Sequence, residues 1–255
     1  MADDKQLSKM CKMGKIKEVR ESLGRGGNPN KKVGTCGRTA LHAAARKGHH
    51  EVVALLLEQP GVDFNATSNT GSTALHYAAA DGHKEVTALL LEQPGVDLNA
   101  ANNSGWVALH YAAAGGHQEV AALLLEQPGM ITTVSANNGR TAFHLAAGHG
   151  HREMVALFLG QPGIVINAAD SHGSTALHAA AFNSHQEVVA LMLDHPGIDV
   201  KATSNRGNTI LHGACHGTCG PDILRRLLTN PDTDPNVKSL RGSTPIMTLL
   251  HRTGH

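Results

Sequence analysis

The chain has 255 residues, of which 41% are hydrophobic and only 3% aromatic, and its net charge is +1. The hydrophobic content is enough to bury a core and argues against disorder, while the shortage of rings indicates a core of Ala, Leu and Val. No apolar run reaches the length of a membrane span, which excludes an integral membrane protein.

The charges are unevenly distributed along the chain. Residues 1–50 contain 12 Lys/Arg against 4 Asp/Glu, residues 51–130 contain 1 against 9, and residues 131–255 contain 9 against 8. Such charges are usually solvated faces, although a basic end can also steer an acidic partner toward the protein. The first residues form no apolar signal segment, and four cysteines do not make a disulfide scaffold. We therefore expect a reducing compartment, the cytoplasm or the nucleus.

An internal repeat dominates the sequence. Glycines open seven units at spacings of 34, 34, 34, 34, 34 and 35 residues, at Gly37, Gly71, Gly105, Gly139, Gly173, Gly207 and Gly242. Six of the units continue as Gly-x-Thr-Ala-Leu-His or a close variant, and five carry a second His seven residues after the first. A fixed period of this length predicts a stack of supersecondary units.

Each segment of one unit has its own expected structure, shown by the unit that begins at Gly71. Residues 77–80 favour a short helix, which a glycine ends. Residues 86–90 place apolar side chains at helical spacing in a second helix, and 93–95 stop it with Pro-Gly. Residues 96–104 are too short and polar for a helix and are expected to form an extended finger. One such unit cannot bury its apolar face alone, so the units must stack.

These residues resemble the ankyrin repeat family. The match runs through Gly-x-Thr-Ala-Leu-His, Ala-Ala, Gly-His, the Val/Leu run and Gly-x-Asp-x-Asn, in register in six units. The resemblance implies an all-α repeat solenoid of period 34, built of helix–turn–helix units with β-hairpin fingers. It implies a capping half-repeat at 1–36, six repeats at 37–241 and the first half of a seventh, truncated repeat at 242–255. We expect the chain to be a fragment of a longer array; alternatively, the last half-unit caps the array.

Eighteen histidines suggest metal or acid–base chemistry, but eleven of them recur at two fixed positions of the repeat. A catalytic group would not recur six times at one offset. The resemblance implies that the first set bridges the Thr hydroxyl and the backbone of the next finger; these are His42, His76, His110, His144, His178 and His212. A cluster of His212, Cys215, His216 and Cys219 has metal-like composition, but zinc needs four converging ligands and Cys215 is expected in the core. We therefore predict no metal, no cofactor and no enzymatic activity.

The resemblance implies a scaffold or adaptor that binds a protein or peptide in a concave groove formed by finger tips and inner helices. Membrane insertion is not expected, and nucleic acid is a disfavoured partner. The predicted contact residues are Arg38, Arg46, Lys47, Asp81, Ser104, Trp106, Asn138, Arg140, His149 and Phe182. Trp106 stands out because the other units have Arg, Ser or Asn there, so it is either an interface anchor or a tolerated exposed ring.

Two further hypotheses concern small groups. A ligand sensor would stack a nucleotide base on Trp106 and hold its phosphates with Arg38, Arg46 or Lys47. The ring lies two repeats from these cations, about 20 Å at one helix diameter per repeat, which favours a protein partner. The resemblance also implies that an asparaginyl hydroxylase modifies the finger-base residues Asn65, Asn99 and Asn167.

Overall fold

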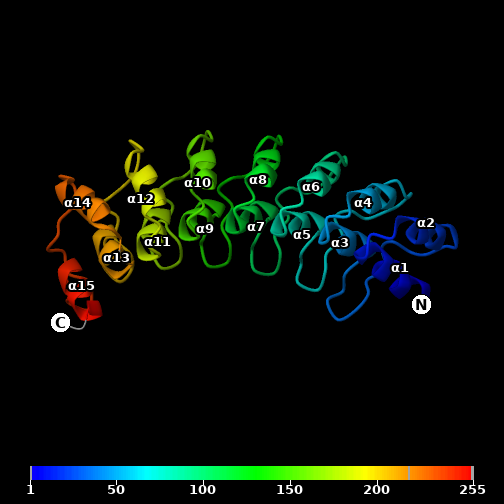
Figure 1. Ribbon diagram of the computed structural model, residues 1–255, viewed down its shortest axis with the longest axis horizontal. Coiled ribbons are helices and arrows are strands. Elements are labelled where there is room, and N and C mark those ends of the chain that lie inside the picture. Colours follow the sequence, from blue (N-terminus) through cyan, green and yellow to red (C-terminus); the bar gives the residue numbers. More distant parts are fainter. Residues whose placement is uncertain (1, 218, 254–255) are drawn as a thin grey trace. The chain divides into compact units, whose positions relative to one another are not determined.

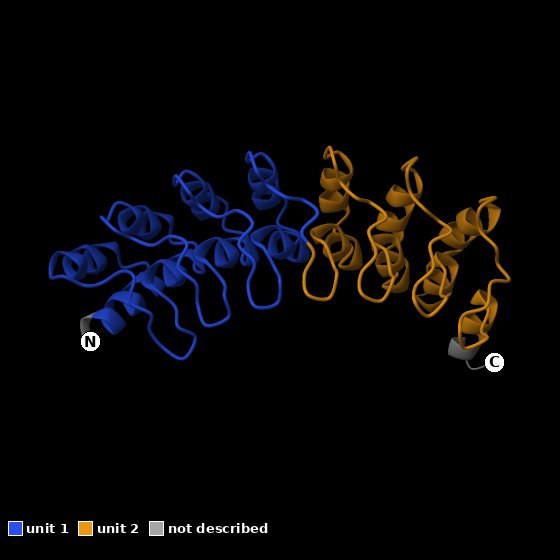
Figure 2. Ribbon diagram, turned by 180° about the vertical axis from the view of Figure 1, so that it is seen from behind, with its two compact units in different colours: residues 1–134 blue, residues 135–255 orange. Residues whose placement is uncertain are grey.

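The computed structural model describes residues 2–217 and 219–253, which form fifteen α-helices and no β-strand. Met1, Thr218, Gly254 and His255, which fall within the predicted domain layout, lie outside the described residues. The chain divides into two compact units, residues 1–134 and residues 135–255 (Figure 2). Each unit is a helical repeat solenoid and is described separately.

Unit 1 contains four helix pairs (Figure 1). The helices are α1 (Ala2–Lys12), α2 (Ile16–Gly24), α3 (Ala40–Ala45), α4 (His50–Leu57), α5 (Ala74–Ala80), α6 (Lys84–Leu91), α7 (Ala108–Gly115) and α8 (Gln118–Leu125). The first helices of the pairs pack in one row, α1 on α3, α3 on α5 and α5 on α7. The second helices α2, α4, α6 and α8 pack in a parallel row.

Unit 2 repeats this arrangement with three pairs and a last single helix. Its helices are α9 (Ala142–Gly148), α10 (Arg152–Leu159), α11 (Ala176–Phe182), α12 (Gln186–Leu193), α13 (Ile210–Gly217), α14 (Pro221–Thr229) and α15 (Pro245–Thr253). The first-helix row runs α9, α11, α13 and α15, and the second-helix row runs α10, α12 and α14.

The core of each repeat is built from small and branched side chains, as the composition predicts. In the repeat opened by Gly71, Ala78 and Ala79 on α5 are fully buried, as is Leu90 on α6. Because an alanine adds little thickness to a helix, successive first helices can approach closely. Unit 2 contains the main exception, where Phe143 and Phe158 fill the core of one repeat with a T-shaped pair of rings.

The fingers do not form the expected β-hairpins in the described part of the chain. Four of them carry one isolated antiparallel bridge each, Val33 with Arg38, Ser135 with Thr141, Ala169 with Thr175 and Thr203 with Thr209. The finger of the second repeat closes by a short turn, in which Ser68 N–H donates to Ser72 C=O at 2.9 Å. Asn69 N–H then donates across to Cys36 C=O at 3.0 Å. Tight turns leave too few residues for a strand ladder, and neighbouring fingers are joined sideways instead.

The first histidine of a repeat joins it to the next repeat. His42 Nδ1 accepts the Thr39 N–H at 3.1 Å and lies 2.7 Å from Thr39 Oγ1. Because Nδ1 is an acceptor, the proton of a neutral ring is on Nε2, which donates to Ser72 C=O at 3.0 Å. The expected bridge is confirmed at His42, His76, His144, His178 and His212. At His110, Val107 replaces the threonine, and Nδ1 accepts the Val107 N–H at 3.2 Å.

The second histidine of a repeat reaches back to the preceding repeat. Nε2 lies 2.9–3.1 Å from a backbone carbonyl 37 residues earlier, in the pairs His49–Lys12, His83–Arg46, His117–Ala80 and His185–Gly148. The ring also covers a glycine of that repeat, as His117 covers Gly82. The repeat opened by Gly71, for example, is therefore tied forward by His76 to Trp106 C=O and backward by His83 to Arg46 C=O.

The contact between His117 and Gly82 can be tested by comparing two glycines of unit 1. Gly82 has φ +73°, and a Cβ there would overlap His117 Nδ1, whereas Gly95 has φ +85° with nothing within 4 Å of such a Cβ. Replacing either by Ala should cost about 1–2 kcal/mol for the left-handed backbone. Gly82→Ala should cost about 1 kcal/mol more, because it displaces a hydrogen-bonded ring.

The measurement is urea-induced unfolding of the two variants and the parent chain. Gly95→Ala supplies the matched control because it carries the same backbone strain without the overlap. Equal losses of unfolding free energy would show that the ring contact contributes nothing.

Candidate functional site

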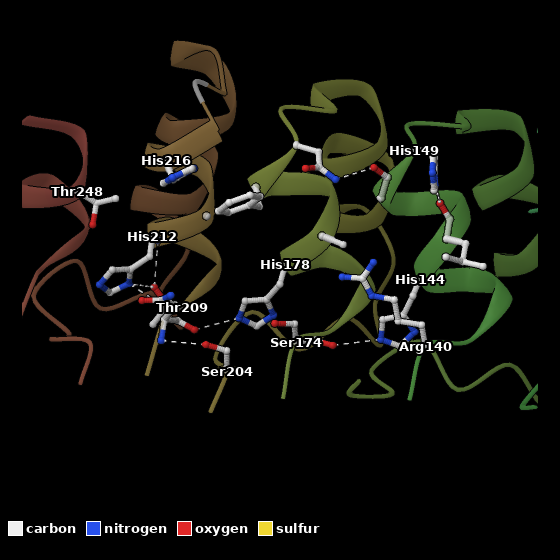
Figure 3. A pocket seen from close by; sticks show the side chains of 17 residues that line it. Arg140, His144, His149, Ser174, His178, Ser204, Thr209, His212, His216 and Thr248 are labelled. Carbon is white, nitrogen blue, oxygen red and sulfur yellow. Dashed lines mark hydrogen bonds between the residues drawn. The ribbon is translucent and has the colours of Figure 1, made fainter. Parts of the chain in front are cut away.

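A groove lies along the fingers and first helices of unit 2. One part of it is a cavity of about 550 Å³, with Thr248 at one end and Arg140 and His149 at the other (Figure 3). His144, His178 and His212, the forward-bridging histidines, are among its lining residues. A second cavity of about 690 Å³ shares Phe182, Asn208, His216 and Thr248 with the first. We call the two cavities together the unit 2 groove.

The unit 2 groove contains an exposed pair of stacked rings. Phe182, at the end of α11, lies 4.2 Å from the ring centroid of His216 on α13, with 12° between the planes. Phe182 is 52% exposed. The equivalent positions of four other repeats hold Arg46, Ala80, Ala114 and Gly148, so packing within a repeat does not require a large ring here. An exposed aromatic group in a groove is a typical anchor for a partner side chain.

The charges around the unit 2 groove are one-sided. Its lining residues include Arg140, Arg206 and Arg241 and no Asp or Glu. Arg140 Nε donates to Asp170 on the next finger at 3.3 Å. Burial alone would raise the pKa of Asp170, but backbone N–H groups of Ser174 and His172 and the Arg140 guanidinium together lower it. The ionised Asp170 thus offsets Arg140, and Arg206 and Arg241 leave the other end of the groove positive.

Three of the predicted contact residues, Arg140, His149 and Phe182, line this one cavity. Asn138 lies on the adjoining finger, where its Oδ1 accepts the Arg140 N–H at 3.2 Å, and does not line it. Sequence reasoning missed Arg241 and Thr248, which lie on either side of Gly242. Arg241 stands one residue before Gly242, as the predicted Asn138 stands one residue before Gly139, so extending the repeat pattern would have identified Arg241. Thr248 corresponds to Leu145, which was not among the predicted residues.

Trp106, in unit 1, packs against other rings of its own repeat. The indole is half-buried, with its ring centroid 4.8 Å from Tyr111 and 5.9 Å from His110, both in its own repeat. The indole is therefore less exposed than expected, because it packs against Tyr111, and its role as a partner contact stays a prediction. Ser104 lies beside it on the exposed finger tip, where its N–H donates to Asn102 Oδ1 at 2.9 Å. Trp106 belongs to unit 1 and Phe182 to unit 2.

The other predicted residues of unit 1 gather near its first repeat. Arg38, Arg46 and Lys47 line a cavity of about 390 Å³ together with Lys12 of α1. Asp81 lies 3.9 Å from Arg46 in an exposed ion pair, the weakest kind energetically. The sequence grouped the three cations correctly but gave no sign of Lys12, because only tertiary packing places α1 beside α3.

The finger-base asparagines have defined structural partners. Asn65 Nδ2 donates to Gly95 C=O at 2.8 Å while its Oδ1 accepts the Asp97 N–H at 3.0 Å. Asn99 and Asn167 make the same two bonds to the next turn, and so does Asn30. Both ends of each amide are thus engaged in joining repeats. Hydroxylation of Asn65, Asn99 and Asn167 stays a prediction.

In the cluster of His212, Cys215, His216 and Cys219, the two cysteines are buried and His212 is hydrogen-bonded within the repeat stack. Cys219 Sγ donates to Ala181 C=O at 3.4 Å, and both Cys215 and Cys219 are buried, which raises the pKa of each thiol. Both ring nitrogens of His212 are bonded within the repeat stack. Across residues 2–217 and 219–253, no three His, Cys, Asp or Glu side chains are grouped to hold a metal ion, and no helix is long and apolar enough to cross a membrane.

A comparison with known protein families agrees with this architecture. A family model described as ankyrin repeats, in three copies, matches the chain over residues 7–102, 94–170 and 165–239.

Proposed function

Because the chain belongs to the ankyrin repeat family, whose repeats are generally protein-interaction modules, we propose that it is a scaffold or adaptor. It holds an extended segment of a partner protein in the unit 2 groove. The observation that carries this proposal is the exposed Phe182 stacked on His216 between the two cavities.

The groove suits a peptide with an apolar side chain and a carboxylate. Phe182 offers an apolar ring that His216 holds in one orientation, so little side-chain entropy is lost when a partner packs on it. Arg206 and Arg241 supply positive charge on the adjoining wall, without a lining carboxylate to offset them. Phe182 and His216 stand on the packed helices α11 and α13, which limits the cost of ordering the site on binding.

The nucleotide-sensing alternative has less support. One edge of the Trp106 ring is packed against Tyr111, and the Arg38 guanidinium lies 4.8 Å over the ring of Tyr77. The Tyr77 face nearest to these cations is therefore occupied by Arg38 itself, so a base would have little to stack on there.

Phe182→Ala tests the proposed function. Peptides selected by display on the parent chain provide the probe, and their dissociation constants are measured by calorimetry. Loss of a hot-spot ring costs about 2 kcal/mol or more, which weakens binding at least about thirtyfold. Because Phe182 is half exposed, the unfolding free energy should change by less than about 0.5 kcal/mol.

Val165→Ala is the matched control, since Val165 is also 52% exposed in unit 2 and lies outside the groove lining. It should leave peptide affinity unchanged. If the selected peptides bound the Phe182→Ala variant as tightly as they bind the parent chain, the unit 2 groove would not be the binding site.

A further inference from the structure

Four cations converge on the cavity between the first helix and the first finger of unit 1. This basic pocket, of about 390 Å³, is lined by Lys12 of α1, Arg38 of the finger, and Arg46 and Lys47 after α3. Its lining residues include no Asp or Glu, although Arg46 is paired with Asp81, outside the lining, at 3.9 Å. Ser8 and Thr35 add two hydroxyl groups. A cluster of donors with no lining acid is suited to a small, highly charged anion.

Arg38 is positioned by the protein before any ligand arrives. Its guanidinium carbon lies 4.8 Å from the centre of the Tyr77 ring. Its Nε is buried and has no hydrogen-bond partner in the described part of the chain. A buried donor left unsatisfied costs free energy. An anion in the pocket would supply the hydrogen-bond acceptor that this Nε lacks.

The lining chemistry distinguishes between classes of anion. No aromatic side chain lines the pocket, so a nucleotide base would find nothing to stack on. No exposed large hydrophobic side chain lines it either, so a membrane surface would gain no apolar contact. What remains is a phosphate group with three acceptor oxygens and nearly two negative charges, presented on a short polar stem.

We propose that the basic pocket binds a phosphate monoester on a serine or threonine of a partner protein. The phosphate oxygens accept from Lys12, Lys47 and the guanidinium of Arg38. The phosphate group is recognised by unit 1 alone, and only the assignment of its carrier to a protein rests on the proposed function. Phosphorylation of the partner would then control its capture by this chain.

The test titrates the full chain with N-acetyl-phosphoserine amide and follows backbone amide resonances by NMR. We expect Gly34, Thr35 and Lys47 to shift, and no shift with unphosphorylated N-acetyl-serine amide. Lys12→Gln/Lys47→Gln should weaken binding about tenfold or more, since each charged hydrogen bond contributes substantially. Both side chains are exposed, so the variant should fold as the parent does.

Lys31→Gln/Lys32→Gln is the matched control, because it also removes two lysine charges, from exposed positions of the finger that carries Arg38 but outside the pocket lining. It should change the affinity by less than about twofold. An equal loss in both double variants would overturn the proposal in favour of diffuse attraction. Tighter binding of adenosine monophosphate would overturn it in favour of a nucleotide, and capture by phosphoinositide vesicles but not phosphoserine in favour of a membrane.

This result is separable from that of the unit 2 groove. Phe182→Ala should leave the phosphoserine titration unchanged, because the ring lies in the other unit. Loss of peptide capture with intact phosphoserine binding would contradict the groove alone, and the reverse pattern would contradict the basic pocket alone.

Discussion

Lowering the pH from 7.5 to 5.5 should destabilise the folded chain by about 1.3 kcal/mol through His42 alone. Burial lowers the pKa of this ring from 6.5 to about 4. The unfolded chain therefore takes up a proton near pH 6.5, while the folded chain resists protonation until the pH approaches 4. Stability is unaffected above about pH 7 and falls as the pH drops through this window.

Three other forward-bridging histidines act in the same direction. Burial lowers the pKa of His76, His144 and His178 as well. Protonating Nδ1 would replace an acceptor by a donor opposite a backbone N–H, so each ring favours its neutral form. The total loss of stability should thus exceed the contribution of His42.

Urea unfolding at a series of pH values measures this effect. His42→Gln should lower the stability at pH 7.5 and also make the pH dependence shallower, whereas the exposed control His50→Gln should leave the slope as it is. A flat profile between pH 7.5 and 5.5 would rule out the neutral bridging role.

Phe158→Ala should destabilise unit 2 by about 3–5 kcal/mol. Phe158 is fully buried on α10, and its ring centroid lies 6.1 Å from that of Phe143 on α9, with 79° between the planes. Removing the ring leaves a cavity and also loses the edge-to-face contact. In a repeat stack, such a loss weakens the interfaces with the neighbouring repeats too.

Phe158→Leu is the informative comparison, because the equivalent positions hold Leu56, Leu90, Leu124 and Met192 in other repeats. It should cost less than half as much as the alanine variant when both are measured by chemical unfolding. If Leu and Ala were equally harmful, the aromatic pair rather than the filled volume would be the stabilising element.

The sequence was sufficient to predict the features that recur in each repeat. It was not sufficient to predict contacts that occur at a single position. The helix pairs and the bridging role of His42 follow from a pattern that six of the seven units share. The half-buried setting of Trp106 could not be foreseen, because it depends on which way a single ring turns toward Tyr111. The pairing of Arg140 with Asp170, 30 residues away, is likewise specific to one pair of fingers.

The site residues divide in the same way. Arg140, His149 and Phe182 could be identified because ankyrin repeats offer these positions, whereas Lys12 required knowledge that α1 packs on α3. The missing β-hairpins have a different cause. Hydrogen bonds between neighbouring fingers, such as Asn69 N–H to Cys36 C=O, take the place of bonds within a finger, and no single-unit pattern reveals that competition.

The two sets of histidine bonds also restrict the number of residues that a repeat can contain. Their acceptors are backbone carbonyls, which every residue supplies. Whether a bond forms therefore depends on the number of residues between the histidine and the carbonyl, and not on which residue carries that carbonyl. If residues 71–104 of unit 1 were excised, His42 would face Trp106 C=O instead of Ser72 C=O, and His117 would face Arg46 C=O instead of Ala80 C=O. Excising only part of that segment would misalign both bonds at once. Genes for such chains can therefore grow or shrink by whole repeats far more readily than by a few codons.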